Sequence, residues 1–154
     1  MEAEYHKSQL FEGITDKGLE GASQFFKTQS SEEMDHMRRL FDYLNDTGTM
    51  PVLGAIDAPP VGFPALAELI KLAYEHEQMI TRKINELAHV AMTLQDYSTF
   101  HFLQWYVAEQ HEEEKMFKSI LDKLALVDTD ASGLFFIDQD LKKMNGDNSV
   151  NTTL

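Results

Sequence analysis

The chain has 154 residues, and its 26 Asp plus Glu against 13 Lys plus Arg give a formal charge of −13. This balance excludes a simple nucleic-acid binder, because phosphate contacts need a cationic surface, and it disfavours binding to anionic membranes. Cysteine is absent, which excludes disulfide frameworks, thiol catalysis and cysteine-ligated metal clusters, so any metal must be held by carboxylates and imidazoles.

The expected elements are all helices, because the few glycines and prolines cluster mostly between about residues 48 and 64. In chain order, the expected helices are a short one at about residues 1–12, a long one from Leu19 to Tyr43 or Leu44, one from about Pro64 to Leu94, one from about Thr99 to Leu126, and a short one from Gly133 to Met144. A stop signal at residues 45–48 ends the first long helix, and Ser98 is a candidate N-cap. Residues 145–154 are expected to form a disordered tail.

No apolar run approaches the ~18–20 residues of a membrane span, so we expect a cytoplasmic protein.

The connection from Asn45 to about Phe63 is long for a helical domain, in which about 2–8 residues are usual. A connection of this length can run the full length of a bundle and join two helices in parallel. The expected fold class is therefore all-α, a four-helix bundle with one long crossover loop and a short C-terminal helix.

Acidic residues lie at the centre of the apolar face of each long helix when about 100° of turn is taken per residue. Glu33, Glu77 and Glu113 each lie in the middle of such a stripe. His36 follows Glu33 by three residues and points inward with it, and Glu109 precedes Glu113 by one turn. The stripes consist of Ala22, Phe26, Met37, Leu40 and Leu44 on the first long helix, Leu66, Ile70, Ala73, Ile84, Ala88 and Ala91 on the second, and Phe102, Tyr106, Phe117, Ile120 and Leu124 on the third.

Ionised carboxylates cannot be buried together without a cation, because isolated burial is costly and like charges repel. Lysine and arginine are absent from the same positions, so the expected cation is a metal ion. A Glu-x-x-His pair, Glu33 and His36, with glutamates from facing helices is the ligand set of di-iron carboxylate bundles, although iron, manganese and zinc all suit such ligands. The alternative is a polar network without a metal, in which these acids are protonated or paired within the core.

Other polar residues on these helices have simpler interpretations. His111 and His76 point away from the stripes and are interpreted as solvated surface histidines. Glu114 and Lys118 are four residues apart and are expected to form a surface ion pair. The helical methionines are interpreted as packing residues rather than haem ligands, so no haem is expected.

Four stretches carry a family resemblance, namely EEMDHMRRLFDYLNDTG, YEHEQMITRKINELAHVAMT, DYSTFHFLQWYVAEQHEEEKMFKSILDKL and GLFFIDQDL. From about Leu19 to Met144 the chain resembles bacterial non-haem ferritins of the ferritin A type, so residues 1–144 are expected to form one ferritin-like domain. The resemblance implies an iron storage protein and ferroxidase. Such a protein is a homo-oligomeric cage of twenty-four subunits that oxidises Fe(II) with O2 or H2O2 and stores Fe(III) as a mineral.

The resemblance also implies roles for individual residues. Glu33 matches the carboxylate that bridges the two irons, and His36 matches the imidazole ligand of the first. Glu77 and Glu113 match ligands of the second iron, and Gln110 matches a glutamine beside it. The residues that resemble a third iron site are Glu32, Glu109, Glu112 and Glu113.

The first helix departs from the family pattern. Counting back without gaps from Leu19, the expected first-helix glutamate falls before Met1, and the expected tyrosine position is Lys7. The residues that could replace this glutamate in a shifted register, although without the family's spacing from a tyrosine, are Glu2, Glu4 and His6. The alternative function is therefore a non-catalytic cage or bundle subunit with an incomplete iron site, which would serve mineral nucleation or structure.

Overall fold

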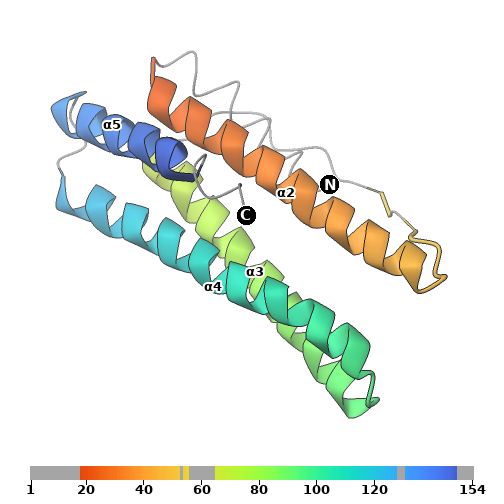
Figure 1. Cartoon of the computed structure of the whole chain (residues 1–154). Helices are drawn as coiled ribbons and strands as arrows, with labels where there is room; N and C mark the ends of the chain where they lie inside the picture. The colour runs from red at the N-terminus through yellow and green to blue at the C-terminus, as the bar shows by residue number, and fades with distance from the viewer. Residues whose placement is uncertain (1–17, 53, 56–64, 128–130, 149–154) are drawn as a thin grey trace. The chain divides into compact units, whose positions relative to one another are not determined.

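The structure is a computed structural model that describes residues 18–52, 54–55, 65–127 and 131–148, and in these ranges it contains four helices and no strand. The helices are α2 (Glu20–Asp46), α3 (Leu66–Thr93), α4 (Tyr97–Leu126) and α5 (Ala131–Asn148), as Figure 1 shows. The helix expected at about residues 1–12 lies outside the described residues, as does most of the long connection that precedes α3. Within the described ranges, no helix is long and apolar enough to cross a membrane.

The helices belong to two compact units. One unit contains α3 and α4, and the other contains α2 and α5. The all-helical class predicted from the sequence is confirmed by the described residues. The boundaries also agree, because α2 and α3 begin and end within three residues of the predicted positions.

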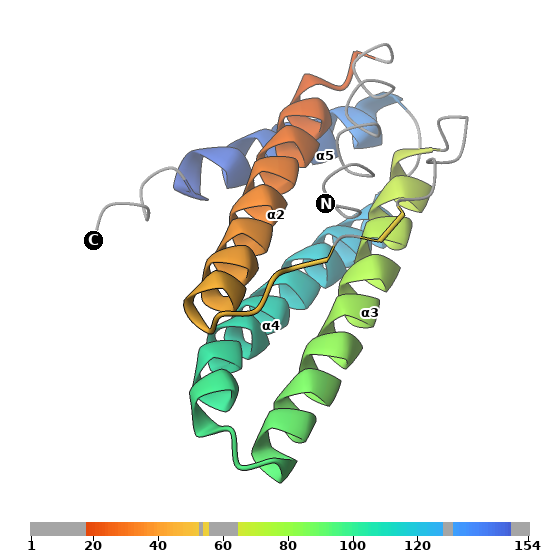
Figure 2. The ribbon, with the colours of Figure 1, turned by 90° about the vertical axis from the view of Figure 1, so that its right-hand side faces the viewer.

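Helices α3 and α4 form an antiparallel pair and lie side by side along their length (Figures 1 and 2). All six apolar residues of the predicted α3 stripe are buried, from Leu66 to Ala91, and Glu77 is buried with them. On α4 the predicted stripe is buried except for Phe102, which is half-buried. Burial of these stripes stabilises the folded chain, because apolar area is removed from water.

Helices α2 and α3 both end in a Schellman turn, in which the chain turns through a left-handed residue. At the end of α2, the amide of Thr49 donates to the carbonyl of Leu44 at 2.9 Å and that of Gly48 donates to the carbonyl of Asn45 at 2.9 Å. Gly48 has φ +76°, which glycine adopts without steric cost. The predicted stop signal is therefore confirmed. In the corresponding turn after α3, Gln95 has φ +59°, a conformation that is costly for a residue with a side chain.

The N-cap of α4 is Asp96, and the prediction of Ser98 was wrong. The Asp96 carboxylate accepts a hydrogen bond from the backbone amide of Thr99 at 3.0 Å and another from the Thr99 hydroxyl at 2.6 Å. Two bonds from one carboxylate fix the first turn, so α4 begins at Tyr97 rather than at Thr99. These bonds to the Thr99 side chain and backbone hold the pKa of Asp96 below its ordinary value of 3.8.

The substitution Asp96→Ala is expected to lower the urea midpoint of unfolding at pH 7, because the amide of Thr99 loses its acceptor. Asp96→Asn should retain most of the stability, since asparagine caps helices about as well as aspartate. The lowered pKa means that the folded state binds the proton less tightly than the unfolded state. The extra stability that the ionised Asp96 carboxylate gives the wild type over Asp96→Asn should thus be complete above pH 3.8. It should be lost as the pH falls through the lowered pKa. Urea titrations of the wild type and both variants at several pH values measure these differences in midpoint. Equal midpoints for the wild type and Asp96→Ala at pH 7 would contradict the role of Asp96 as a stabilising cap.

In the other unit, the buried residues of α2 all lie between Gly21 and Ser30. Ala22 and Phe26 are buried as predicted, whereas the later stripe residues Met37, Leu40 and Leu44 are half-buried. Helix α5 packs against α2 and runs to Asn148, beyond the predicted end at Met144. Residues 145–148 of the predicted tail are therefore helical, and residues 149–154 lie outside the described part of the chain.

Candidate metal centre

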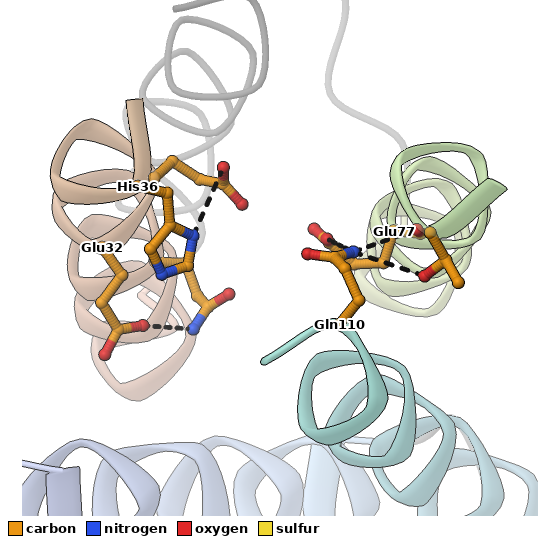
Figure 3. Close-up of polar contacts among 7 residues, drawn as sticks. Glu32, His36, Glu77 and Gln110 are labelled. Carbon is orange, nitrogen blue, oxygen red and sulfur yellow. Dashed lines mark hydrogen bonds and ion pairs between the residues drawn. The ribbon is translucent and has the colours of Figure 1, made fainter. Parts of the chain in front are cut away.

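On the α3–α4 pair, two carboxylates and an amide are buried together. Glu77 is fully buried, and Gln110 and Glu113 are 4% and 7% exposed. The amide nitrogen of Gln110 donates to the Glu77 carboxylate oxygen Oε2 at 3.1 Å and to the Glu77 backbone carbonyl at 3.2 Å, and Figure 3 shows the Gln110 amide directed at Glu77. These two bonds hold the Glu77 side chain and its backbone in one orientation. Glu77 and Glu113 were predicted at the centres of their stripes, and their burial agrees with that prediction.

These buried carboxylates retain oxygen atoms that a cation could use. Oε1 of Glu77 and Oε2 of Glu113 are buried and accept no hydrogen bond from the described residues. Within α3 and α4, which are described in full, the buried residues include no lysine or arginine. Burial of two carboxylates on facing helices carries a large desolvation cost, which a bound cation would offset.

A second polar group lies on α2. The Nδ1 atom of His36 is 4.0 Å from the Glu33 carboxylate oxygen Oε2, and both side chains are 15% exposed. One turn of helix separates them, so the two side chains lie on the same face. Glu32 beside them accepts a hydrogen bond of 2.6 Å from the amide of Gln29 (Figure 3). The carboxylate and the imidazole are thus close enough to share one metal ion.

The residues that resemble a third iron site differ in their exposure. Glu32 and Glu109 are half-buried, and Glu113 is buried. The Glu112 side chain is 65% exposed and forms an ion pair of 3.1 Å with Lys115. Glu32 therefore lies on α2 and the other three acids on α4, and of these Glu112 lies on the solvent side of its helix.

Two surface predictions were wrong. Lys118 pairs with Asp122 rather than with Glu114, and Glu114 is half-buried. Lys118 has carboxylates four residues away on either side, and each such pair is worth only about a few tenths of a kcal/mol, so small differences in the surroundings decide which pair forms. His76 is half-buried rather than solvated, while His111 is exposed as predicted.

Sequence reasoning missed two polar residues beside the candidate ligands. Gln29 is buried and positions Glu32, and Thr81 lies 3.5 Å from the Gln110 amide through its hydroxyl. Gln29 lies four residues before Glu33, and Thr81 lies four residues after Glu77. The same helical periodicity that identified the two glutamates could therefore have found both residues.

The predicted ligands fall into two groups, one in each unit. Glu33 and His36 are brought together on α2, and Glu77, Gln110 and Glu113 on α3 and α4. In the part of the chain that the structure describes, no three His, Asp, Glu or Cys side chains form a cluster that could hold a metal ion.

The family of the chain follows from a comparison with known proteins. The family model of the ferritin-like domain matches residues 6–127, and a bacterial non-heme ferritin from Escherichia coli O157:H7 is 55% identical over 130 residues, which cover 84% of this chain and 79% of the relative. The chain belongs to the ferritin family. A probable bacterial non-heme ferritin-like protein from Haemophilus influenzae is 48% identical over 149 residues, covering 94% of this chain and 90% of the relative.

Solved ferritin structures share the fold. An open pore ferritin from the archaeon Archaeoglobus fulgidus superimposes with a TM-score of 0.87 at 35% identity, covering 92% of this chain and 86% of that one. The ferritin of Chlorobium tepidum superimposes with a TM-score of 0.80 at 40% identity, covering 92% of this chain and 88% of that one. The predicted ferritin-like bundle and the predicted membership among bacterial non-haem ferritins are confirmed, and the chain is an iron storage ferritin.

Proposed function

We propose that this ferritin oxidises Fe(II) at a di-iron site whose ligands are Glu33, His36, Glu77 and Glu113. The observation that carries the proposal is the burial of Glu77 and Glu113 on facing helices, with Gln110 holding Glu77 in place. Carboxylates are poor occupants of a helical core unless a cation binds there. Carboxylate and imidazole ligands without thiolate suit iron.

The proposed reaction is a transfer of electrons from two Fe(II) ions to one molecule of O2. Each iron loses one electron, and O2 takes up two electrons and two protons to give H2O2. Glu33 bridges the two ions and His36 binds the first, while Glu77 and Glu113 bind the second. Negatively charged oxygen ligands favour Fe(III) over Fe(II), because the attraction grows with the charge of the ion. H2O2 is itself an alternative oxidant for further Fe(II).

We further propose that residues 1–144 form one domain, that the subunits assemble into a cage of twenty-four copies, and that Fe(III) is stored inside as a mineral. Glu32, Glu109 and Glu112 with Glu113 form the proposed third iron site. Of these, Glu112 forms an ion pair with Lys115, with which iron would compete for the carboxylate. The cytoplasmic location also stays a prediction.

The alternative is a non-catalytic subunit with an incomplete first iron site, because the first helix departs from the family pattern, with Lys7 at the position expected for a tyrosine. Addition of Fe(II) to the purified apoprotein in air separates the two functions. The ferroxidase predicts ferric absorbance that rises faster than in buffer, and a rate equal to buffer would favour the non-catalytic subunit. Size-exclusion chromatography tests the cage separately, and a small oligomer would contradict it.

A further inference from the structure

The first turn of α2 is capped by a side chain from another helix. A helix begins with four backbone amides that lack intrahelical partners, and a Ser, Thr, Asp or Asn at the N-cap usually accepts from one of them. In α2 the N-cap position is Leu19, and no side-chain cap bond forms there. The amide of Ala22 instead donates to Oδ1 of Asp138 on α5 at 2.8 Å, across 116 residues of sequence.

Asp138 is suited to this task because its carboxylate is buried, at 6% exposed, against the start of the helix. Amides at a helix N-terminus carry partial positive charge, which stabilises a nearby carboxylate. Hydrogen bonds from amides to an ionised acceptor are also stronger than those to a neutral one. Asp138 therefore occupies the place that a local N-cap residue would normally take.

The backbones of the two helices also lie in close contact at this point. A Cβ atom added to Gly21 would lie 1.9 Å from the backbone carbonyl oxygen of Asp138, which is far too close for two atoms that are not bonded to each other. Gly21 thus permits an approach that any other residue would prevent. Figure 2 shows α5 crossing α2 near the start of α2.

The face that α5 turns toward α2 is defined by its burial pattern. Gly133, Ile137 and Leu141 are buried at intervals of four residues, and Asp138 is buried beside them. Phe135 and Phe136 are 59% and 68% exposed. The Asp138 bond and the Gly21 contact therefore fix both the position and the rotation of α5.

We propose that Asp138 and Gly21 form a latch, through which the C-terminal helix caps α2 and orders its first turn. In this arrangement the docking of α5 and the ordering of the first turn of α2 are one coupled event. Release of α5 leaves the amide of Ala22 without its acceptor, and opening of the first turn of α2 removes the surface on which Asp138 is held. The latch concerns α2 and α5 alone and does not depend on iron.

Hydrogen exchange measured by mass spectrometry on the purified, assembled protein tests the latch. Asp138→Ala is expected to accelerate exchange in peptides from both the start of α2 and α5 by about five- to thirtyfold, as loss of a helix cap implies. Asp138→Asn keeps an acceptor oxygen and should restore part of the protection in both. Asp42→Asn removes an exposed carboxylate from α2 and serves as the matched control, with no expected change.

Gly21→Ala provides an independent variant, in case Asp138→Ala does not fold. Alanine favours helices over glycine, so a local effect alone would slow exchange in α2. The latch instead predicts that Gly21→Ala exchanges faster than the wild type in α5, because the new Cβ displaces the Asp138 backbone. Unchanged exchange in Asp138→Ala, acceleration confined to α2, or slower exchange in α5 of Gly21→Ala would each overturn the proposal.

Discussion

Purified protein carrying Glu113→Gln is expected to oxidise Fe(II) at least about tenfold more slowly than wild type at the same ratio of iron to subunit. Loss of residues that merely orient metal ligands typically costs 10–100-fold, and loss of a ligand should cost no less. Glutamine keeps the size of the side chain and removes its negative charge, so the effect reports iron binding rather than packing. Glu77→Gln should give a loss of similar size, since Glu77 is buried on the facing helix. Stopped-flow absorbance of Fe(III) in air measures both rates.

Glu75→Gln is the matched control for these two variants. Glu75 lies two residues from Glu77 on α3, but its side chain is 54% exposed and forms a surface ion pair with Lys71. Such pairs contribute little, so oxidation should proceed at the wild-type rate. Urea midpoints of all three variants near that of the wild type would show that the fold is retained. Wild-type oxidation rates in Glu77→Gln and Glu113→Gln would refute the proposed site.

The largest effect on stability is expected for Phe117→Ala. The Phe117 side chain on α4 is fully buried, so truncation removes apolar contacts and leaves a cavity that the helices fill only in part. Such changes cost about 3–5 kcal/mol. The midpoint of urea unfolding should fall accordingly, and it is measured at fixed subunit concentration because the proposed assembly would add to stability.

Phe117→Leu completes a graded series at the same position. Leucine fills most of the space, so the loss should be clearly smaller than for alanine. Equal stabilities of the wild type and Phe117→Ala would contradict the burial of Phe117 in the core.

The helical periodicity of the sequence predicted α3 and α4 well. Turn angles alone placed Glu77 among buried apolar residues, and the structure buries it completely. Periodicity succeeds here because a partner helix covers α3 along its whole length, so that direction around the axis decides burial. The same reasoning failed in the second half of α2, where Met37, Leu40 and Leu44 are half-buried. Periodicity gives the direction of a side chain but not how far along the helix its cover extends.

Contacts between residues far apart in sequence could not be predicted in the same way. The bond from Ala22 to Asp138 joins α2 to α5 over 116 residues, and no local pattern indicates it. The sequence also does not show which of two neighbouring candidates forms an interaction. Asp96 rather than Ser98 caps α4, and Lys118 pairs with Asp122 rather than with Glu114. These choices differ by small free energies that depend on the folded surroundings.

Some features of the candidate site follow from the sequence, and others appear only in the structure. The glutamates at the stripe centres were found from the sequence, and Gln110 and Glu112 came from the family resemblance. The exposure of Glu112 and its pair with Lys115 appear only in the structure. Gln29 and Thr81 share the helical spacing of the glutamates, but a neutral amide or hydroxyl at such a position does not by itself indicate a metal site.

The central claim, that Glu33, His36, Glu77 and Glu113 together bind two iron ions, is tested most directly by crystallography. Crystals soaked in Fe(II), with anomalous diffraction recorded at the iron edge, would locate the metal without reliance on activity. The proposal predicts two iron peaks bridged by Glu33, one bound by His36 and the other by Glu77 and Glu113. Iron only at exposed acids such as Glu112, or no iron peak beside these four side chains, would contradict it.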